Sequence, residues 1–220
     1  MRILVLGGTG PSGQLLIEEG LSLNHSIVVL ARSPQKLPEV IRNHAYVTVI
    51  EGELTNENVI DKAMEGVDAV ISALGPAVKK GPFHPSDTPL AKAYSLVIKV
   101  MKKHGVKRLI ALGTASIKDE HDKFSAVFMT LVTGVAVFAH NAYKDVVAIG
   151  ETIRGEGGDL SWTIVRVPIL TEDSKRDVVA GYIGDGVVKP HLTRAAFAAF
   201  VLQQLDSKEW QQKAPLISSP

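Results

Sequence analysis

The feature that most constrains the fold of this chain is a glycine-rich stretch close to its N-terminus, GGTGPSG at residues 7–13. It follows an apolar run at residues 3–6 and precedes a segment of helix-forming residues that begins at Gln14. A short apolar run in this position is typical of a buried parallel strand, so the glycines are predicted to form a strand-to-helix turn. The N–H groups and the dipole at the start of the helix favour an anion, which in such units is a dinucleotide pyrophosphate.

Each glycine of this turn has an expected role. Gly7 would permit the sharp change of direction, Gly10 the close approach of a pyrophosphate, and Gly13 the close packing of helix on strand. The spacing G-x-x-G-x-x-G matches the common fingerprint only in part, and a glycine turn without a ligand is the alternative. We favour phosphate binding because strand, turn and helix occur in the required order. The residues of the turn predicted to contact the cofactor are Gly7, Thr9, Gly10, Pro11, Ser12 and Gly13.

Length and composition predict one α/β domain over residues 1–220, with 45% hydrophobic residues to fill its core. The 24 Lys and Arg against 23 Asp and Glu provide no basic surface for nucleic acid or for an acidic membrane. Without cysteine the chain forms no disulfide, thiol nucleophile or cysteine metal site, and no metal site is predicted. The chain begins directly with a core strand, which leaves no room for a signal peptide, so a cytoplasmic location is expected.

The end of the second predicted strand, residues 27–30, indicates which dinucleotide binds. An acidic residue about 20 positions beyond the glycines suits the ribose 2′-hydroxyl of NAD, whereas a cation suits the 2′-phosphate of NADP. Arg32 occupies this position, and its planar guanidinium can fork onto phosphate oxygens. Lys36, one helical turn further on, would add a second charge, although a solvated basic loop is the alternative for both. The sequence therefore predicts NADP(H) as the cofactor.

The next two predicted strands end where a dinucleotide should pass, because ligands lie beyond the carboxyl ends of the strands. Residues 46–50 lead to Glu53 and Leu54 beside the expected adenine position, although a surface carboxylate in a turn explains Glu53 equally well. Residues 68–76 supply the fourth strand and its exit loop, where small residues let the backbone come close to the cofactor. The exit-loop residues predicted to border the cofactor are Ala73, Leu74 and Gly75.

A loop and a helix are predicted between the fourth and fifth strands. Residues 77–89 are rich in Pro, Gly and Lys, and they either fold over a bound cofactor or simply connect the two elements. Residues 90–104 form the helix, which Gly105 ends.

The fifth predicted strand, residues 108–112, leads into Thr114 and Ser116 at the carboxyl end of the sheet. Either hydroxyl could hydrogen-bond a substrate carbonyl during hydride transfer, although such residues often only cap or form turns. Both are candidate catalytic residues, and Thr114 is also a predicted cofactor contact.

Residues 124–139 carry no charge, and at sixteen residues this stretch is shorter than the roughly 18 to 20 that span a bilayer. With Gly134 in its middle, it is predicted to be a wall of the substrate pocket or a subunit contact rather than a membrane anchor. Together with the loop-like residues 171–190, it defines two substrate-side segments, at about 117–142 and 169–192.

The remaining predicted elements are a helix at residues 141–154, a sixth strand at 160–168, a last helix at 195–205 capped by Thr193, and a short edge strand at 214–217. Pro168, at the end of the sixth strand, is a further predicted cofactor contact.

With these features in place, the chain resembles the atypical short-chain dehydrogenase/reductases. Within them it is most similar to the compact NAD(P)H-binding group that includes biliverdin IX-beta (flavin) reductase and the NmrA-like proteins. Residues 7–13 match that group's opening, Arg32 and Lys36 match its 2′-phosphate contacts, and residues 159–168 are similar to its late strand. The resemblance covers nearly the whole chain and implies a single doubly wound Rossmann domain with a mostly parallel sheet.

Many of these relatives use a Tyr-x-x-x-Lys pair, in which the lysine lowers the tyrosine pKa so that the tyrosine can exchange a proton with substrate. The resemblance places the tyrosine at Tyr143 and the lysine at Val147, counted back from Glu151, so the lysine is absent. Lys144 lies about 100° around a helix from Tyr143 and does not replace it. Tyr143 is therefore either a catalytic residue or a core residue, and the proton is expected to come from water or from a substrate group.

These features predict an NADP(H)-dependent reductase that transfers a hydride to a small aromatic or conjugated acceptor, acting as a monomer or homodimer. An NmrA-like NADP(H) sensor without catalysis is the alternative from another class. An isomerase or cyclase on the same scaffold is a third possibility.

Overall fold

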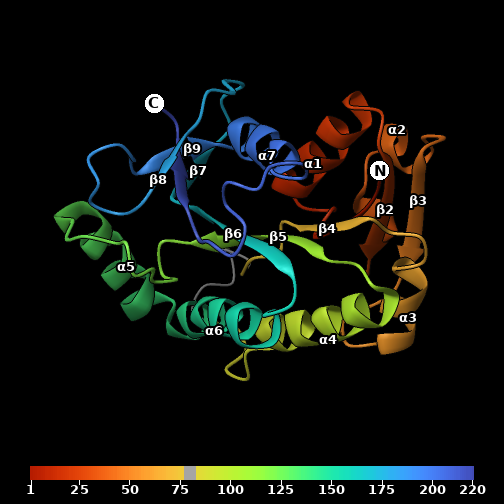
Figure 1. Ribbon diagram of the computed structural model, residues 1–220, viewed down its shortest axis with the longest axis horizontal. Coiled ribbons are helices and arrows are strands. Elements are labelled where there is room, and N and C mark those ends of the chain that lie inside the picture. The colour runs from red at the N-terminus through yellow and green to blue at the C-terminus, as the bar shows by residue number, and fades with distance from the viewer. Residues whose placement is uncertain (77–82) are drawn as a thin grey trace.

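The computed structural model describes residues 1–76 and 83–220 and confirms the doubly wound α/β fold (Figure 1). Eight strands form one sheet in the order β3-β2-β1-β4-β5-β6-β10-β8, and the first six follow the order of a dinucleotide-binding fold. The pairings are parallel, except that β8 runs antiparallel to β10. The strands are β1 (Arg2–Leu6), β2 (Ser26–Ala31), β3 (Val47–Glu51), β4 (Ala69–Ser72), β5 (Arg108–Thr114), β6 (Ser161–Val167), β8 (Val179–Gly181) and β10 (Leu216–Ser218).

Helices cover both faces of the sheet (Figure 1). The helices α1 (Pro11–Ser22) and α7 (Arg194–Gln203) lie on one face. On the other face lie α3 (Glu57–Ala63), α4 (Pro89–His104) and α6 (His140–Glu156). The central strands are therefore buried on both sides, which explains why their sequences are almost continuously apolar.

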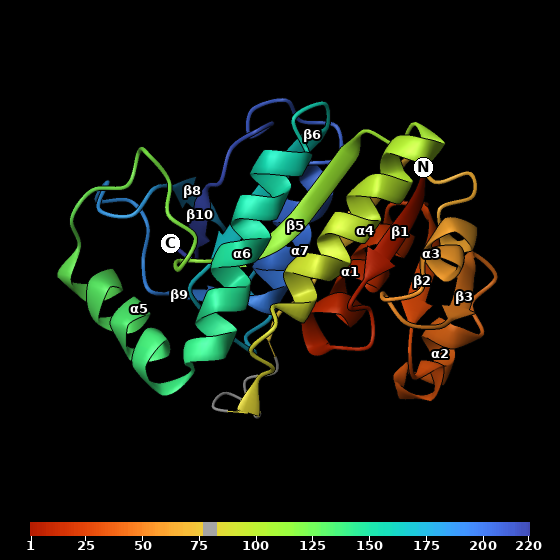
Figure 2. The same ribbon diagram turned by 90° about the horizontal axis from the view of Figure 1, so that it is seen from below.

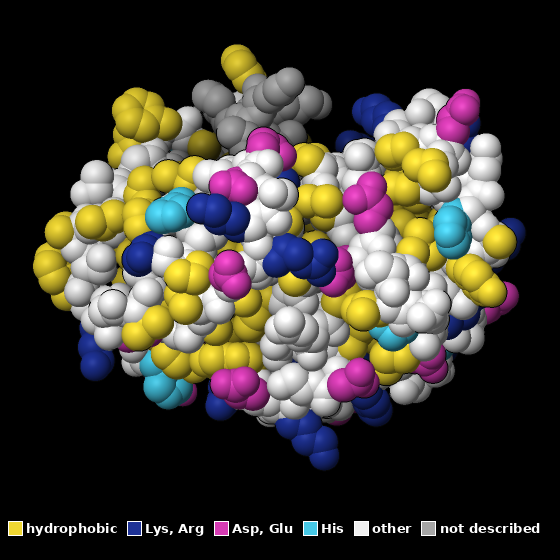
Figure 3. Space-filling view, turned by 90° about the horizontal axis from the view of Figure 1, so that it is seen from above, with side chains coloured by type: hydrophobic (Ala, Val, Ile, Leu, Met, Phe, Trp, Pro, Cys, Tyr) yellow, Lys and Arg dark blue, Asp and Glu magenta, His cyan; other side chains and the backbone are white. Residues whose placement is uncertain are grey.

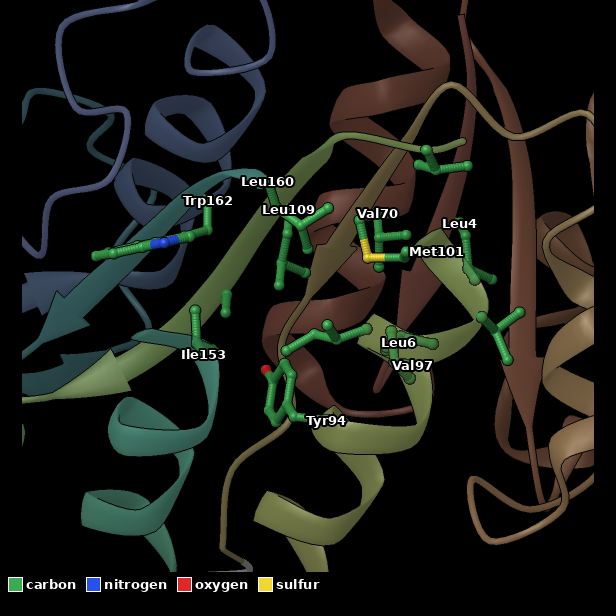
Figure 4. Packing of buried hydrophobic residues seen from close by; sticks show 14 of the residues in the cluster. Leu4, Leu6, Val70, Tyr94, Val97, Met101, Leu109, Ile153, Leu160 and Trp162 are labelled. Atoms are coloured by element: carbon green, nitrogen blue, oxygen red, sulfur yellow. The ribbon is translucent and has the colours of Figure 1, made fainter. Parts of the chain in front are cut away.

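The hydrophobic core on the α4 face holds the start of that helix against the sheet. Leu4, Val70 and Leu109 project from three neighbouring strands toward α4 (Figure 4). Tyr94 of α4 is fully buried, and its hydroxyl donates a hydrogen bond of 2.7 Å to Ser72 Oγ at the end of β4. Burial raises the pKa of Tyr94, so its hydroxyl stays protonated and serves as a donor. The carboxyl end of β4 is thus fixed to the first turns of α4.

Capping residues mark several helix ends, and of these Thr193 and Gly105 were predicted. Asn56 caps α3 by accepting hydrogen bonds from two backbone N–H groups, and the hydroxyl of Thr193 caps α7. Gly105 follows α4 in the left-handed conformation with φ of 70°, as predicted for the residue that ends this helix. The tip after β2, for which no element was predicted, contains a short 3₁₀ turn, η1 (Pro34–Lys36), and the four-residue helix α2 (Glu39–Arg42).

Two predictions for the last third of the chain are wrong. The short strand predicted at the sheet edge is β10, which lies inside the sheet between β6 and β8. The residues 171–190 that were predicted to be loop-like contain β8. In addition, β7 (Ile169–Thr171) and β9 (His191–Thr193) form a separate two-stranded parallel sheet. Strands of three residues are too short to show a period-2 pattern, and only their partners from distant parts of the chain define them.

The uncharged stretch at residues 124–139 forms α5 (Ala126–Phe138), which projects from the body at one end of the sheet (Figures 1 and 2). Phe128 is its one buried residue, and it packs on Ile183, so the two predicted substrate-side segments lie together. The outward residues, Val137 and Phe138 among them, are exposed, and Figure 3 shows hydrophobic side chains gathering at this end of the molecule. A role as pocket wall or subunit contact stays a prediction.

In the described residues no single helix has the length and hydropathy to cross a membrane. α5 and α6 together meet those two criteria as a pair, with a bend of 117° between them.

Candidate functional site

The glycine turn connects β1 to α1 at the point where the winding of the sheet reverses. β1 pairs with β2 on one side and with β4 on the other, so the turn lies at the topological switch point where doubly wound folds bind ligands. Gly7 adopts φ of 75°, and a Cβ on this residue would lie 3.0 Å from the carbonyl carbon of Ala73. A Cβ on Gly13 would lie 2.1 Å from the Gly7 carbonyl oxygen. At both positions the neighbouring backbone leaves no room for a side chain.

Gly10 differs from these two glycines because no protein atom requires it. It has an extended conformation, and a Cβ there would meet only the Gly7 carbonyl oxygen at the ordinary distance of 3.5 Å. Gly10 is the residue before α1, and Pro11 follows at the first helical position, where its missing N–H costs little. No side chain caps this helix, so its first N–H groups stay available to a ligand. This open cradle at a helix start fits a dinucleotide pyrophosphate.

Thr9 and Ser12 complete the turn. Thr9 is half-buried and its carbonyl accepts a hydrogen bond of 3.3 Å from the Gln14 side chain, whereas Ser12 is buried on the first turn of α1. Sequence reasoning did not single out Gly8, although a Cβ there would lie 2.8 Å from a methyl group of Val29 on β2 and 3.1 Å from one of Ile17 on α1. Gly8 therefore shares with Gly13 the task of letting α1 pack closely.

Arg32 follows β2 directly, next to the strand that carries the glycine turn. Its side chain is exposed, and the part of the chain described by the structure offers it no ion pair or hydrogen bond. Lys36 ends η1 and is likewise exposed. Both cations are therefore accessible to a phosphate beyond the end of β2.

The other predicted cofactor contacts lie at the ends of β3 and β4. Glu53 is exposed and accepts a hydrogen bond of 3.3 Å from the Thr55 hydroxyl, while Leu54 packs on the core. The half-buried exit residues Ala73 and Leu74 line the turn at Gly7, where a Cβ would lie 3.1 Å from the Leu74 nitrogen. The structure therefore brings the β4 exit against the glycine turn and leaves Glu53 at the surface. Gly75 is exposed beyond them. Of the loop predicted at residues 77–89, residues 77–82 lie outside the described residues.

Thr114 and Ser116 lie at the end of β5, as expected, but they differ in how far they are exposed to solvent. Thr114 is half-buried, and its hydroxyl oxygen accepts a hydrogen bond of 3.2 Å from the Ser116 N–H, which forms a local turn. Ser116 is buried. Pro168 is half-buried and directly follows β6, the strand that pairs with β5. Thr114 is therefore the better placed of the two hydroxyls to meet a ligand.

Tyr143 lies in the first turns of α6 and is half-buried, with Val147 one turn further on. On the same face of α6, a Cβ on Gly150 would lie 2.7 Å from a methyl group of Ile117, just beyond Ser116. This face of the helix is therefore directed toward the segment that follows β5. Val147 provides no cation next to the tyrosine hydroxyl.

Sequence reasoning missed a pair formed by His84, five residues before α4, and Asp145 in the first turns of α6. Asp145 of α6 is fully buried and accepts hydrogen bonds from the backbone N–H groups of Leu90 and Ala91, at 3.1 and 3.0 Å. Its Oδ2 atom also lies 2.7 Å from Nε2 of His84. One signal was available, because Asp145 falls in the apolar stripe of α6 that includes Ala142 and Ile149.

A second buried charge cluster fixes the segment after β5. Arg166 of β6 is fully buried, and its guanidinium forks onto both carboxylate oxygens of Asp122 at 2.7 and 2.8 Å. It also donates to the carbonyl oxygens of Ile117 and Ala214, at 2.9 and 2.6 Å. Asp122 in turn accepts a hydrogen bond from the Ile183 N–H. This cluster ties both substrate-side segments to the sheet.

Two surface hollows lie away from the glycine turn. One, of about 250 Å³, lies between α1 and α7 and is lined in part by Glu19 and Arg176. The other, of about 420 Å³, lies along α5 and includes Met129 and Phe138. Neither contains a residue of the turn, so we define the site by its backbone cradle.

This cradle and the fold around it agree with the comparison to known families. The family model described as NAD(P)H-binding matches residues 7–208, and the chain belongs to this family.

Among curated relatives, a probable pinoresinol-lariciresinol reductase from Arabidopsis thaliana is 25% identical over 233 aligned residues, with 100% of this chain and 68% of the relative covered. A photosystem II assembly factor from Synechocystis sp. is 34% identical over 73 residues, which span 33% of this chain and 22% of that protein. An isoflavone reductase homolog from Nicotiana glauca is 36% identical over 80 residues, which span 34% of this chain and 26% of that protein. The two higher-identity matches thus cover about a quarter of each relative.

Solved structures with the same fold include a short-chain dehydrogenase/reductase from Veillonella parvula, with a TM-score of 0.83, 18% identity and coverage of 100% of this chain and 94% of that one. A structure of such a protein from the same organism in complex with NADP has a TM-score of 0.76, 19% identity and the same coverage. An anaerobilin reductase from Escherichia coli O157:H7 has a TM-score of 0.75 and 17% identity, with 100% and 98% of the two chains covered. These likenesses show a short-chain dehydrogenase/reductase-like fold.

Proposed function

We propose that this protein is an NADP(H)-dependent reductase that transfers a hydride to a small aromatic or conjugated acceptor. The observation that carries the proposal is the open cradle at Gly10, at the topological switch point, with the exposed cation of Arg32 beyond the neighbouring strand. The reductases among its relatives support the reaction class.

The preference for NADP(H) depends on Arg32. A guanidinium that is exposed and has no carboxylate partner in the described chain is available for a bidentate contact with a 2′-phosphate. Lys36 would add a weaker point charge from the end of η1. An acidic residue, which would select the free hydroxyl of NAD, does not occupy this position.

The residues around the β5 and α6 ends would orient the acceptor. The bound cofactor would supply the hydride. Thr114 is half-buried at the strand end, and Tyr143 is half-buried on the helix face directed to the same segment. Each hydroxyl can hydrogen-bond an acceptor oxygen or nitrogen, but with Val147 at the lysine position the family's cation is missing beside Tyr143. Their role would therefore be positioning by hydrogen bonds.

The proposal is tested by measuring NADPH oxidation with flavins, quinones, linear tetrapyrroles and aromatic ketones, together with a calorimetric titration of NADPH. Turnover of at least one acceptor class is expected. Val147 at the lysine position also favours the NmrA-like sensor, which would bind NADPH but oxidise it with none of these acceptors. Tight binding without turnover would therefore replace the reductase by the sensor.

A further inference from the structure

Asp145 accepts hydrogen bonds from the first turn of α4, and it also holds the imidazole of His84 in a buried pair. The Nε2 atom of His84 lies 2.7 Å from Asp145 Oδ2, and the two side chains are 9% and 0% exposed. The Asn141 side chain also donates a hydrogen bond of 2.9 Å to the His84 carbonyl oxygen. The imidazole is thus held by one ring nitrogen. The other nitrogen, Nδ1, has no hydrogen-bond partner among the described residues.

Two other histidine and carboxylate pairs in the described chain provide a comparison. His104 Nε2 lies 2.8 Å from Asp61 Oδ1 at the end of α4, and these side chains are 21% and 33% exposed. His121 Nδ1 lies 2.9 Å from Asp119, which is two residues away in the sequence. Both pairs are open to solvent. Only the pair of His84 and Asp145 combines a fully buried carboxylate with a ring held by residues distant in sequence.

The pair also lies at the functional end of the sheet. Asp145 binds the N–H groups of Leu90 and Ala91 in the first turn of α4, and it belongs to the first turns of α6. Both helices begin at the carboxyl ends of strands, because each returns antiparallel to the strand that precedes it. Figure 2 shows these two helix starts side by side at one edge of the molecule. His104, at the other end of α4, lies at the opposite edge.

We propose that His84, oriented by Asp145, donates the proton that the acceptor takes up when it is reduced. The inference rests on the proposed reductase function. It assigns to His84 the role of proton donor, for which Tyr143 lacks the neighbouring lysine of its relatives. Asp145 would be a positioning residue. A carboxylate bonded to one ring nitrogen fixes the orientation of a histidine and stabilises its protonated form, which leaves the second nitrogen to donate.

The step balances in protons and electrons. The acceptor gains a hydride, which brings both electrons, and a proton from Nδ1 of His84. The Nδ1–H bond breaks, and its electron pair stays on the ring as the lone pair of the neutral imidazole. Asp145 remains ionised and bonded to Nε2, and His84 then recovers a proton from water.

The charged residues described near His84 belong to α6 and to the start of α4. Asp145 faces it from α6, and Asp87 with its partner Lys92 lies at the start of α4, where the Lys92 ammonium and, to a lesser degree, His84 lower the pKa of Asp87. Lys144 of α6 is exposed. Among the residues that the structure describes, the buried Asp145 is thus the one charge in hydrogen-bond contact with the ring.

The test compares two glutamine variants in the full-length protein. His84→Gln should lower kcat at least 100-fold on any acceptor that the wild type reduces, which is the contribution typical of a general acid. His104→Gln removes a histidine from a pair of similar geometry at the other end of the same helix, and it should stay within threefold of wild type. The kcat of the wild type and of His104→Gln should fall as pH rises, because the acid is lost, whereas the residual rate of His84→Gln should not depend on pH.

A readout without turnover comes from nitrogen-15 NMR of the histidine rings in the cofactor-free protein. The neutral His84 ring should carry its proton on Nε2, the nitrogen that lies 2.7 Å from Asp145 Oδ2. Asp145→Asn should weaken this preference for the Nε2 tautomer, since the carboxylate that accepts from Nε2 is gone.

The outcomes separate the two proposals. Wild-type turnover with an unchanged rate in His84→Gln would overturn the role of His84 and leave the reductase standing. A neutral ring with its proton on Nδ1 would likewise overturn it, because Asp145 would then not hold the ring through an Nε2–H bond. Absence of turnover in the wild type with every acceptor would overturn the reductase and, with it, the proton step.

Discussion

Removing the carboxylate of Asp122 should destabilise the protein strongly, because it leaves the Arg166 guanidinium buried without a counter-charge. Arg166 is fully buried, and Asp122 provides two of its four hydrogen-bond acceptors. Breaking a buried ion pair from one side typically costs 3–5 kcal/mol. The Asp122 side chain is 16% exposed, so water can reach part of the vacated space, and we expect Asp122→Ala to cost about 3 kcal/mol. For a chain of this size, that corresponds to a fall in Tm of about 6–12 °C.

The destabilisation caused by Asp122→Ala should change with pH in a definite direction. Burial acts to raise the pKa of Asp122, but hydrogen bonds and charge from Arg166, with the N–H groups of Asp119 and Ile183, hold it below its ordinary value. A carboxyl whose pKa is lower in the folded state stabilises the fold above its unfolded pKa, and this contribution disappears as pH falls through the folded pKa. The Tm difference between wild type and Asp122→Ala should therefore be largest at pH 6–7 and shrink below about pH 4.

The assay is thermal unfolding followed by circular dichroism at pH 7 and at several acid pH values. Asp159→Ala is the matched control, because it removes an aspartate that pairs with Lys102 and Lys107 at the exposed surface. Its Tm should change little. Equal Tm changes in the two variants, or an Asp122→Ala difference that grows as pH falls, would refute the reasoning.

The remaining predictions concern the glycine turn and Tyr143. Gly10→Val should stay folded and lose NADPH binding, whereas Gly13→Ala should have a lower Tm because its Cβ would lie 2.1 Å from the Gly7 oxygen. Circular dichroism measures folding and Tm, and a titration measures NADPH binding. Normal binding by Gly10→Val would show that the phosphate site lies elsewhere. Tyr143→Phe should lower kcat by no more than about tenfold to a hundredfold, or roughly 1.4–2.8 kcal/mol, and Val147→Lys should not raise it. Steady-state kinetics decide this, and a loss of several thousandfold would make Tyr143 the proton donor.

The elements that the sequence predicted well are those with a local signal. The apolar run at residues 3–6, the capping residue Thr193 and the glycine at 105 each indicate their structure from a few neighbouring positions. The strand β10 has no such signal, because its place inside the sheet depends on Leu216 pairing with residues of β6 and β8 from distant parts of the chain. Hydrophobic pattern alone made it resemble an edge strand.

The same distinction applies to the site. Gly10 and Arg32 were recognised from spacing along the chain, and the structure places them on neighbouring strand ends. The contact of His84 with Asp145 joins residues 61 positions apart, and that of Asp122 with Arg166 joins residues 44 apart. No periodicity or motif encodes contacts of that kind, since they arise only when helix starts and strands pack together.

The measurement that tests the central claim most directly is a calorimetric titration of the wild type and of Arg32→Ala with NADPH and NADH. The wild type should bind NADPH more tightly, and Arg32→Ala should lose roughly 10-fold to 150-fold of that preference, which corresponds to a charge-assisted contact of about 1.5–3 kcal/mol. Lys36→Ala should lose less, because it removes a single exposed charge. Equal affinities of the wild type for NADPH and NADH would contradict the account.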